Sequence, residues 1–413
     1  MNYRPLPEDR YDQFREYLNY AFNPESGPEV DDEDWDPAEQ PGAMRGLFDG
    51  EDLLCVCRHY WFRTRVRGRW TEMPGLSAVA SPPEHRRKGH VAAMLAESLA
   101  EYHDRGDFLT ALWAFEHPFY AKYGWGLTTK YVSYECSPDV LDFARERVDD
   151  DAERAGEFRQ VDADDHEELD AVLAADNEPY ELALDRTEKW WRKRVFESWR
   201  KDPYAYAWER DGEIRGYLVY TVEKEGDGKQ LAVRELAAVD DEAYRHCLRF
   251  LANHDSQVET VRIYGPERTD LFDRVRDPAD VDCEVKPGPM VRLVDVPAAF
   301  EALDYGGADG DANVVRVSGE FTLAVTDPLA EWNDRTFRVA IDDGRATCDP
   351  ADEISVADAD ARVGVGTLSQ VYVGYHSVAD AERLGDLEVR DAAVRETLTA
   401  MFPPRDVFLR EGF

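Results

Sequence analysis

A short basic turn lies in an otherwise acidic sequence. Residues 85–91 read HRRKGHV, so Arg86, Arg87 and Lys88 run directly into Gly89. The strand-like segment LSAVAS precedes this turn, and GHVAAMLAESLAEYHDRG, which has the apolar spacing of a helix, follows it. The first turn of a helix offers unpaired backbone N–H groups and a positive dipole end, which together bind anions. Pyrophosphate is the natural ligand of such a turn, but the turn taken alone fits a solvated helix start better, and binding to nucleic acid is a third alternative.

A segment rich in aromatic residues lies further along the chain. After the buried strand expected for FLTALWAF, the chain reads HPFYAKYGWG over 117–126. This segment contains two tyrosines, Tyr120 and Tyr123. On residue type alone, packing in a core explains either side chain equally well.

The charge of the chain argues against several classes of partner. The sequence has 87 acidic and 49 basic residues, a net charge of −38, and the acids are spread along its length. Binding to nucleic acid or an anionic membrane needs cations clustered over a wide face, so we expect neither partner. Adaptation to high salt is the simpler explanation, although the field would also attract a cationic substrate. Without an apolar run of ~20 residues or a signal-peptide pattern, a soluble, cytoplasmic protein is expected.

The cysteines and histidines lack the spacing of a metal site, so none is expected. Cys55 and Cys57 share one face of an expected strand, and no second pair or histidine cluster accompanies them. We interpret the six cysteines as small buried side chains in a reduced compartment. Four histidines are interpreted as surface or core residues rather than bases: His59, His85, His90 and His117.

The elements that must position these residues follow from periodicity. We expect an amphipathic helix in 8–22, strands in 45–66 and 69–81, and a closing strand LTTKYVSYEC over 127–136. An acidic stretch over 23–42 is expected to be a loop or a short helix over a cleft. These elements surround the basic turn and Tyr120, and together they would form one α/β unit.

The rest of the chain divides into two further units. The acidic segment 146–165 marks the first boundary, and we place domains at 1–150, 151–296 and 297–413. In the last of these, short strands precede a helix TLSQVYVGYHS, an order that predicts an α+β domain with an antiparallel sheet.

An internal repeat links the first two domains. Residues 231–267 repeat the order of residues 73–116: strand, turn, amphipathic helix, turn, strand. Where the first copy has the basic turn, the second has DDEAYRHC over 240–247, without the cluster of cations or the glycine. The second copy is therefore expected to have lost the function of that turn.

The first copy resembles the GNAT acetyltransferase superfamily. In that superfamily the pattern Arg/Gln-x-x-Gly-x-Gly/Ala grips the pyrophosphate of coenzyme A, and RRKGHV over 86–91 matches it except for valine in the last position. FYAKYGW is similar to the superfamily's FYxKxGF, whose tyrosine stands beside the departing thiolate. By this resemblance Tyr120 is the general acid, and its local rival Tyr123 falls at a position that the motif leaves free. A tyrosine of ordinary pKa about 10 is well matched to a thiolate leaving group of pKa about 8.5.

The whole chain resembles the Eis-like (enhanced intracellular survival) N-acetyltransferases. SPPEHRRKGHVAAML and ALWAFEHPFYAKYGWG look like that family's two signature stretches, and GTLSQVYVGYHS resembles part of its C-terminal domain. The resemblance implies an α/β (α+β) fold class. It consists of two tandem GNAT-like acetyltransferase folds, the second degenerate, and a C-terminal α+β sterol carrier protein-like domain. It also implies a homo-oligomer, a hexamer in family members.

The same resemblance assigns the site residues. The terminal carboxylate of Phe413 would be the general base, because the terminus of family members folds back into the active site of the first domain. The alternative for Phe413 is packing at the end of a sheet. Acetyl-CoA contacts are implied at three places: Val79, Ala80 and Ser81 on a strand edge, Arg87, Lys88, Gly89, His90, Val91 and Ala92 at the pyrophosphate, and Phe115 with Glu116. Four aromatic residues could line an amine pocket or simply pack: Phe22, Trp35, Trp61 and Trp113.

Two functions follow as hypotheses. The first is an acetyl-CoA-dependent N-acetyltransferase acting by direct transfer in a ternary complex on a primary amine, which could be an aminoglycoside-like polyamine, a lysine side chain or a peptide amine. The second is a non-catalytic acyl-CoA- or lipid-binding protein that uses the sterol carrier-like domain. The intact basic turn and Tyr120 in the first copy, beside their loss in the second, favour the enzyme.

Overall fold

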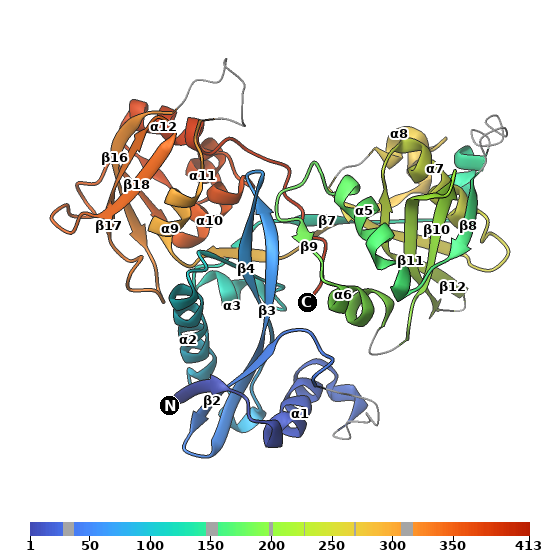
Figure 1. The fold of residues 1–413 in the computed structure, drawn as a ribbon, viewed down its shortest axis with the longest axis horizontal. Coiled ribbons are helices and arrows are strands. Elements are labelled where there is room, and N and C mark those ends of the chain that lie inside the picture. Colours follow the sequence, from blue (N-terminus) through green and yellow to red (C-terminus); the bar gives the residue numbers. More distant parts are fainter. Residues whose placement is uncertain (28–36, 146–155, 198–200, 227, 268–269, 307–316) are drawn as a thin grey trace. The chain divides into compact units, whose positions relative to one another are not determined.

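The computed structural model describes residues 1–27, 37–145, 156–197, 201–226, 228–267, 270–306 and 317–413 (Figure 1). The chain divides into two compact units. The first unit comprises Met1–Ala38, Gly42–Thr129 and Gly288–Phe413, and the second comprises Glu39–Pro41 and Lys130–Pro287. No helix of the described residues is long and apolar enough to cross a membrane.

The first unit contains a twisted mixed sheet whose strands follow the order β1-β2-β3-β4-β5-β15-β6. Neighbouring strands along this order are antiparallel except for β4 and β5, which are parallel. The bounds of the strands are β1 (Asn2–Pro5), β2 (Ala43–Asp49), β3 (Asp52–Val66), β4 (Arg69–Ala80), β5 (Leu109–Leu112), β6 (Gly126–Leu127) and β15 (Met290–Leu293). The expected strands in 45–66 and 69–81 are confirmed, the first as a hairpin of β2 and β3.

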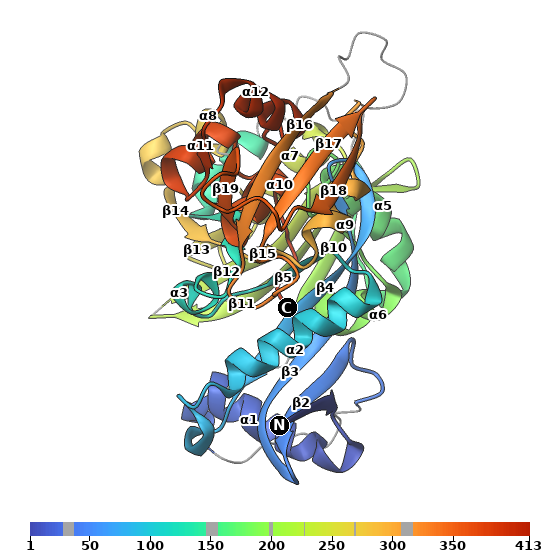
Figure 2. The same ribbon diagram turned by 90° about the vertical axis from the view of Figure 1, so that its left-hand side faces the viewer.

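Helices cover the two faces of this sheet. Helix α1 (Tyr11–Phe22) packs Phe14 and Tyr17 against one face, and α2 (His90–Arg105) packs against the other. Figure 2 shows α2 running across the strands β2 to β4. The short helix α3 (His117–Ala121) follows β5. Because side chains alternate along β3, Cys55, Cys57 and His59 face α2, whereas Val56 faces α1.

Two strands belong to different sheets from those that the sequence predicted. The closing strand expected over 127–136 is split: β6 stays in the first sheet, whereas β7 (Lys130–Cys136) pairs with β13 and β14 in the second unit. In turn β15, which falls inside the domain predicted over 151–296, inserts between β5 and β6. The compact units change at residues 129/130 and 287/288, whereas the predicted domains meet at 150/151 and 296/297. Both strands are short and apolar enough to suit either sheet, so their own pattern could not assign them.

The second unit repeats the plan of the first. Its sheet has the order β14-β7-β13-β12-β11-β10-β8, and β12 and β13 are its parallel pair, joined through α7. This confirms the repeat predicted from residues 231–267. Its elements are β7, β8 (Glu157–Gln160), α5 (His166–Asp176), β9 (Leu184–Asp185), α6 (Glu188–Trp190), β10 (Tyr204–Arg210), β11 (Glu213–Glu225), β12 (Gly228–Ala238), α7 (Asp241–Ala252), β13 (Thr260–Pro266), α8 (Leu271–Arg274) and β14 (Asp282–Pro287).

The C-terminal domain is α+β, as expected, but its sheet is mixed. The order is β18-β17-β16-β19-β20, and β16 and β19 run parallel, where the sequence predicted only antiparallel pairing. Helix α10 begins at Val365, two residues before the predicted helix, and packs against β6 and β15. The elements are α9 (Val296–Ala302), β16 (Gly319–Thr326), β17 (Thr336–Asp342), β18 (Arg345–Pro350), β19 (Ala361–Gly364), α10 (Val365–Val373), α11 (Val378–Leu384), β20 (Glu388–Val389) and α12 (Ala392–Met401).

Candidate active site

The basic turn leaves the N-terminus of α2 open. A 3-10 turn over Pro83–His85 leads into Arg87, whose φ is 58°, and Gly89, whose φ is 85°. Gly89 is the N-cap of α2, and no side chain caps the helix. A Cβ placed on Gly89 would meet nothing within 4 Å, so glycine is required here by its left-handed backbone and not by protein packing. The free N–H groups of the first turn, at His90, Val91 and Ala92, are thus available to an external anion.

Of the three cations in the turn, Arg86 stabilises the turn, whereas Arg87 and Lys88 do not. Arg86 donates from Nε to the carbonyl of Ser81 at 3.0 Å, and its guanidinium lies 5.0 Å from the centre of the Tyr20 ring. Arg87 and Lys88 are exposed, and neither forms an ion pair within the described part of the chain. Two unpaired cations thus lie beside an open helix end, a local concentration of positive charge in a protein of net charge −38.

Val91, the residue that departs from the superfamily pattern, is half-buried. Its side chain packs against the core cluster that contains Met94 and Leu95 of the same helix. The valine therefore contributes to packing beneath α2, and its backbone N–H remains in the first turn with that of Ala92. The departure changes the core side of the turn without removing a backbone donor.

Strand β4 extends beyond its parallel partner. The β4–β5 pairing comprises Gly75 with Ala111 and Leu76 with Leu112, while β4 continues to Ala80. A β-bulge at this point gives Ala78 a φ of 53°. No described strand pairs with the β5 side of 77–80, so this backbone edge can accept an amide-containing ligand.

The side chains on this edge are used within the protein. Val79 packs against the same core as Val91, Ala80 is buried beneath α1, and Ser81 donates from Oγ to the carbonyl of Leu54 at 3.1 Å. Val79, Ala80 and Ser81 thus have only their backbone to offer a ligand. The structure brings this edge next to the basic turn through the bond from Arg86 to Ser81.

Tyr120 is buried among aromatic rings. Its ring centre lies 5.9 Å from that of Phe115, 5.1 Å from Phe119 and 6.2 Å from Trp125, and its exposed fraction is 2%. Burial, with a smaller contribution from Cys57, raises the pKa of Tyr120 above its ordinary value. The phenol therefore stays protonated at neutral pH, which suits a proton donor but makes it a weaker acid than a free tyrosine.

Phe115 and Glu116 lie in the segment between β5 and α3. Phe115 is 67% exposed and Glu116 is the exposed N-cap residue of α3, so both are accessible to a ligand. Tyr123, the local rival of Tyr120, is half-buried, and Lys122 lies 4.6 Å above its ring. Of the two tyrosines, Tyr120 is therefore the buried one and Tyr123 is not.

The C-terminal segment folds back on the first sheet. The indole N–H of Trp113 donates to the carbonyl of Glu411 at 2.5 Å, and the ring of Phe413 lies 4.9 Å from Phe62 and 5.8 Å from Tyr60. A Cβ on Gly75 would lie 2.9 Å from the Phe413 ring. Figure 1 shows α2 and the C-terminus on opposite sides of β3 and β4. Phe413 therefore lies on the face of the sheet opposite to α2, at the end of the β4–β5 pairing.

The other aromatic candidates have separate places. Trp113 holds the C-terminal segment, whereas the ring of Trp61 lies 3.8 Å beneath the guanidinium of Arg105. Phe22 is 42% exposed on α1, and Trp35 lies outside the described residues. Of the three that the structure describes, Trp113 is the one with a hydrogen bond to the C-terminal segment that ends at Phe413.

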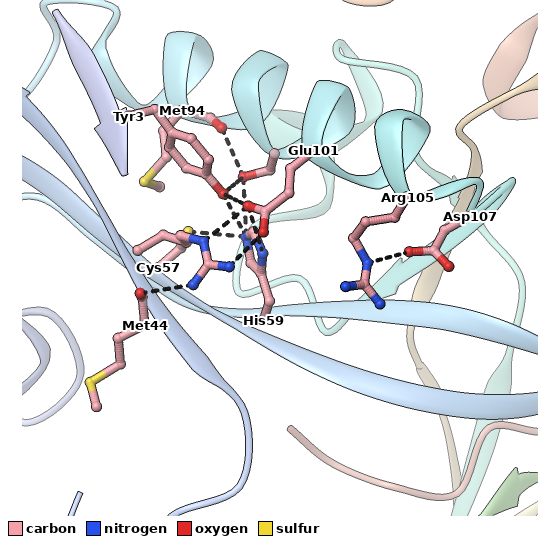
Figure 3. Close-up of polar contacts among 10 residues, drawn as sticks. Tyr3, Met44, Cys57, His59, Met94, Glu101, Arg105 and Asp107 are labelled. Carbon is pink, nitrogen blue, oxygen red and sulfur yellow. Dashed lines mark hydrogen bonds and ion pairs between the residues drawn. The ribbon is translucent and has the colours of Figure 1, made fainter. Parts of the chain in front are cut away.

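A buried polar network joins α2 to β1, β2 and β3 (Figure 3). His59 Nε2 lies 3.2 Å from the hydroxyl of Tyr3, 3.3 Å from that of Ser98 and 3.5 Å from Cys57 Sγ. Glu101 of α2 accepts from Tyr3 at 2.7 Å and from Arg45 Nε at 3.0 Å. Because the network lies under the helix that begins at the basic turn, it fixes the position of that helix on the sheet.

His59 is the core histidine that the sequence interpretation allowed. Its side chain is fully buried, and burial lowers its pKa to about 3, so it is neutral. All six cysteines are free, and five of them are buried. Among the described residues no group of three or more histidine, cysteine, aspartate or glutamate side chains could hold a metal ion. Sequence patterns could not indicate the network, because its members come from four separate segments of the chain.

In the second unit, the helix N-terminus equivalent to that of α2 is capped by a side chain. Helix α7 has Asp240 as its N-cap, and the carboxylate accepts from the backbone N–H of Ala243 at 2.9 Å and pairs with Arg215. Burial alone would raise the pKa of Asp240, but the bonds from Ala243 and Arg215 outweigh it and lower the pKa. The protein's own carboxylate thus occupies the anion position of α7.

Known protein families match all three parts of the chain. The Acetyltransferase (GNAT) domain matches residues 2–128, a second Acetyltransferase (GNAT) domain family matches 182–293, and the Sterol carrier protein domain matches 296–410. An uncharacterized N-acetyltransferase of Streptomyces griseus is 28% identical over 377 residues, covering 87% of this chain and 86% of the relative. N-acetyltransferase Eis of Mycobacterium tuberculosis is 28% identical over 375 residues, covering 86% and 85%.

Solved structures share the fold over the full length. A probable N-acyltransferase from Enterococcus faecalis has a TM-score of 0.83 at 21% identity, covering 100% of this chain and 99% of that one. Eis1 from Mycobacterium abscessus has a TM-score of 0.72 at 20% identity, covering 100% of both chains.

The fold and the matching domains define the class of the protein. Two tandem GNAT folds and a sterol carrier protein domain make the chain an acyltransferase of the GNAT superfamily, whose domains generally use acetyl-CoA. The likeness to N-acetyltransferase Eis over most of the chain agrees with the Eis-like resemblance of the sequence. The fold class expected from the sequence is thereby confirmed.

Proposed function

We propose that the protein transfers an acetyl group from acetyl-CoA directly to a primary amine in a ternary complex. The observation that carries this proposal is the open N-terminus of α2 with the unpaired Arg87 and Lys88, next to the unpaired edge of β4. The pyrophosphate would bind the backbone N–H groups of Gly89 to Ala92 with the two cations. The pantetheine amides would pair with the backbone of Val79 to Ser81, and Phe115 and Glu116 would make further contacts.

Tyr120 and Phe413 would act from opposite faces of the sheet. The thioester would lie where β4 and β5 cease to pair, because groups on both faces of the sheet could reach it there. Tyr120 would protonate the departing thiolate from the α2 side. The α-carboxylate of Phe413 would accept the proton of the ammonium from the other side, through water. An α-carboxylate has an ordinary pKa of about 3.5, so this role requires an environment that raises its basicity.

The amine is a cation before it reacts, which suits the acidic surface. An aminoglycoside-like polyamine, a lysine side chain and a peptide amine all fit this requirement. The test is release of thiol from acetyl-CoA with one amine of each kind. Bound coenzyme without thiol release for any amine would contradict the proposal and favour the non-catalytic acyl-CoA- or lipid-binding alternative.

The role of Tyr120 has a matched control three residues away. Tyr120→Phe should lower kcat by about 10²-fold or more with the KM for acetyl-CoA nearly unchanged, because only the proton donor is lost. Tyr123→Phe removes a phenol from the same segment and should retain wild-type kcat. Equal effects of the two substitutions would contradict the assignment.

The role of Phe413 is tested by moving the carboxylate. Adding residues after Phe413 should lower kcat strongly and leave coenzyme affinity nearly intact, since the ring can still pack on Phe62. Intact mass of the starting protein must first show that its chain ends at Phe413. Unchanged turnover in the extended protein would contradict the proposal.

Three broader expectations remain predictions. A homo-oligomer, a hexamer by the resemblance, is checked by light scattering, and adaptation to high salt by activity and stability as functions of salt concentration. A cytoplasmic location is checked by cell fractionation.

A further inference from the structure

A buried ion pair links the C-terminal domain to the turn that follows Tyr120. Arg292 of β15 and Asp327, which directly follows β16, both have fully buried side chains. Nη2 of Arg292 donates to the two carboxylate oxygens of Asp327 at 2.6 and 2.7 Å. Nη1 of the same guanidinium donates to the backbone carbonyl of Tyr123 at 2.5 Å. One side chain thus joins the two parts of the first unit.

The aspartate end of the pair is held rigidly. The carboxylate of Asp327 also accepts from the backbone N–H groups of Leu329 and Ala330, each at 3.0 Å, and from Asn333 Nδ2 at 3.1 Å. Asn333 donates from the same amide nitrogen to the carbonyl of Val294 at 2.9 Å, just after β15. The position of the guanidinium is therefore set by the C-terminal domain.

The other end is the turn that closes the Tyr120 helix. The backbone N–H groups of Tyr123 and Trp125 both donate to the carbonyl of Tyr120, at 2.9 and 3.3 Å. The guanidinium of Arg292 also lies 5.2 Å from the ring of Trp125, which contacts Tyr120 edge-on. A Cβ on Gly124 would come within 2.0 Å of Arg292 Nη1, so the turn and the guanidinium are in close contact.

Helix α10 supports the same turn. A Cβ on Gly126 would lie 2.5 Å from the carbonyl of Gly366, and Gln370 donates from Nε2 to the carbonyl of Leu127 at 2.8 Å. The turn after Tyr120 is therefore contacted by both Arg292 and α10.

A buried ion pair is a poor way to gain stability. Removing two charges from water costs several kcal/mol per ion, and well-packed apolar residues often stabilise a fold as much or more. The pair instead fixes geometry, because the planar guanidinium of Arg292 binds the Asp327 carboxylate and the Tyr123 carbonyl at once. We propose that Arg292 and Asp327 are positioning residues that hold Tyr120 in place for proton transfer, so that the sterol carrier protein domain completes the catalytic site. This inference rests on the role proposed above for Tyr120.

The test is a double-mutant cycle with Tyr120→Phe. The double substitution Arg292→Met with Asp327→Leu replaces the pair by apolar side chains, so that no charge is left buried alone. It should lower kcat by about tenfold or more with the KM for acetyl-CoA unchanged, because displacement of a catalytic group by about 1 Å is costly. In the Tyr120→Phe background the same double substitution should have little further effect on kcat.

Arg67→Met is the matched control. Arg67, in the turn between β3 and β4, also joins the two parts of the unit, donating to the carbonyls of Tyr372, Val371 and Pro403 at 2.6 to 3.0 Å. These bonds do not involve the turn after Tyr120. Arg67→Met should lower thermal stability and retain kcat.

The outcomes separate the two proposals. The positioning role alone would be overturned if the double substitution Arg292→Met with Asp327→Leu lowered kcat equally in the wild-type and Tyr120→Phe backgrounds. Wild-type kcat in the folded protein with this double substitution would also overturn it. Wild-type kcat in Tyr120→Phe would overturn the role of Tyr120 and this inference with it. If the apolar double variant does not fold, Arg292→Lys takes its place in the cycle, because lysine keeps the charge opposite Asp327 but lacks the second arm that reaches Tyr123.

Discussion

Protonation of His59 should open the core of the first sheet at mildly acidic pH. The side chain is fully buried beneath α2, and burial lowers its pKa from 6.5 to about 3. In the unfolded chain the imidazole regains its ordinary pKa, so between these two values the unfolded state binds a proton that the folded state does not. The folded state therefore has its full stability with respect to His59 above about pH 6.5. This stability is lost progressively as the pH falls from 6.5 towards 3.

The magnitude follows from the unfolded pKa. At pH 5.0 the unfolded imidazole is 1.5 pH units below its pKa of 6.5, while the folded imidazole remains neutral. The free energy of unfolding should therefore be lower at pH 5.0 than at pH 7.5 by about 2 kcal/mol, an increase of about thirtyfold in the opening equilibrium. Glu101 does not add to this, because bonds from Arg45 and Tyr3 outweigh its burial and lower its pKa, so it stays ionised at pH 5.0.

The assay uses thiols that the same core buries. Cys55 and Cys57 have no exposed surface, so a pyridyl disulfide, which reacts at acidic pH, labels them only when the core opens. Urea titrations are made at both pH values, and labelling of the peptide that contains Cys55 and Cys57 is measured by mass spectrometry. The labelling reports opening of the first sheet alone. His59→Gln keeps a polar atom near the position of Nε2 without a titrating group. Its opening should be independent of pH in this range.

The control is a histidine in the other compact unit. His166→Gln should leave the pH dependence of Cys57 labelling as in the wild type. A wild-type protein whose labelling midpoint does not move between pH 7.5 and 5.0 would refute the reasoning. So would a His59→Gln variant that retains the whole shift.

Three further substitutions test the turn and its surroundings. Gly89→Ala should cost about 1–2 kcal/mol of stability from the left-handed backbone and raise the KM for acetyl-CoA, measured by thermal denaturation and initial rates; unchanged values would contradict the geometry of the turn. Arg87→Gln with Lys88→Gln should raise the KM for acetyl-CoA by about tenfold and weaken its salt dependence while kcat stays, and an unaltered salt dependence would exclude these cations from the site. Gly124→Ala should destabilise the first unit by about 3 kcal/mol in thermal denaturation, because its Cβ would overlap Arg292, and a wild-type melting curve would contradict this contact.

The local elements of the candidate site could be predicted from the sequence. The turn over 85–91 has glycine, cations and flanking periodicity that each point to the start of a helix, and the structure begins α2 at His90. Tyr120 and Tyr123 could be separated only by resemblance, since both are aromatic residues in one short segment. Burial of Tyr120 then raises its pKa, which the ordinary value used for the sequence did not include.

Long-range partners could not be predicted. Arg292 is a single cation in the apolar segment MVRLVDV, and nothing nearby in the sequence indicates Asp327 or the carbonyl of Tyr123 as its partner. The exchange of β7 and β15 between sheets was missed for the same reason. Alternation of side chains specifies that a strand has a buried face, but not which sheet supplies that burial.

The place of β15 in the first sheet also constrains how the protein is made. Ribosomes add about 5–20 residues per second, so roughly ten to thirty seconds separate the synthesis of β6 from that of β15. During that interval β5 and β6 lack the strand that joins them, and the turn after Tyr120 lacks Arg292. The second unit, by contrast, is continuous from β7 to β14 apart from three residues that precede it. The nascent chain should therefore complete its second unit before its first, and acquire the site only when the C-terminal domain emerges.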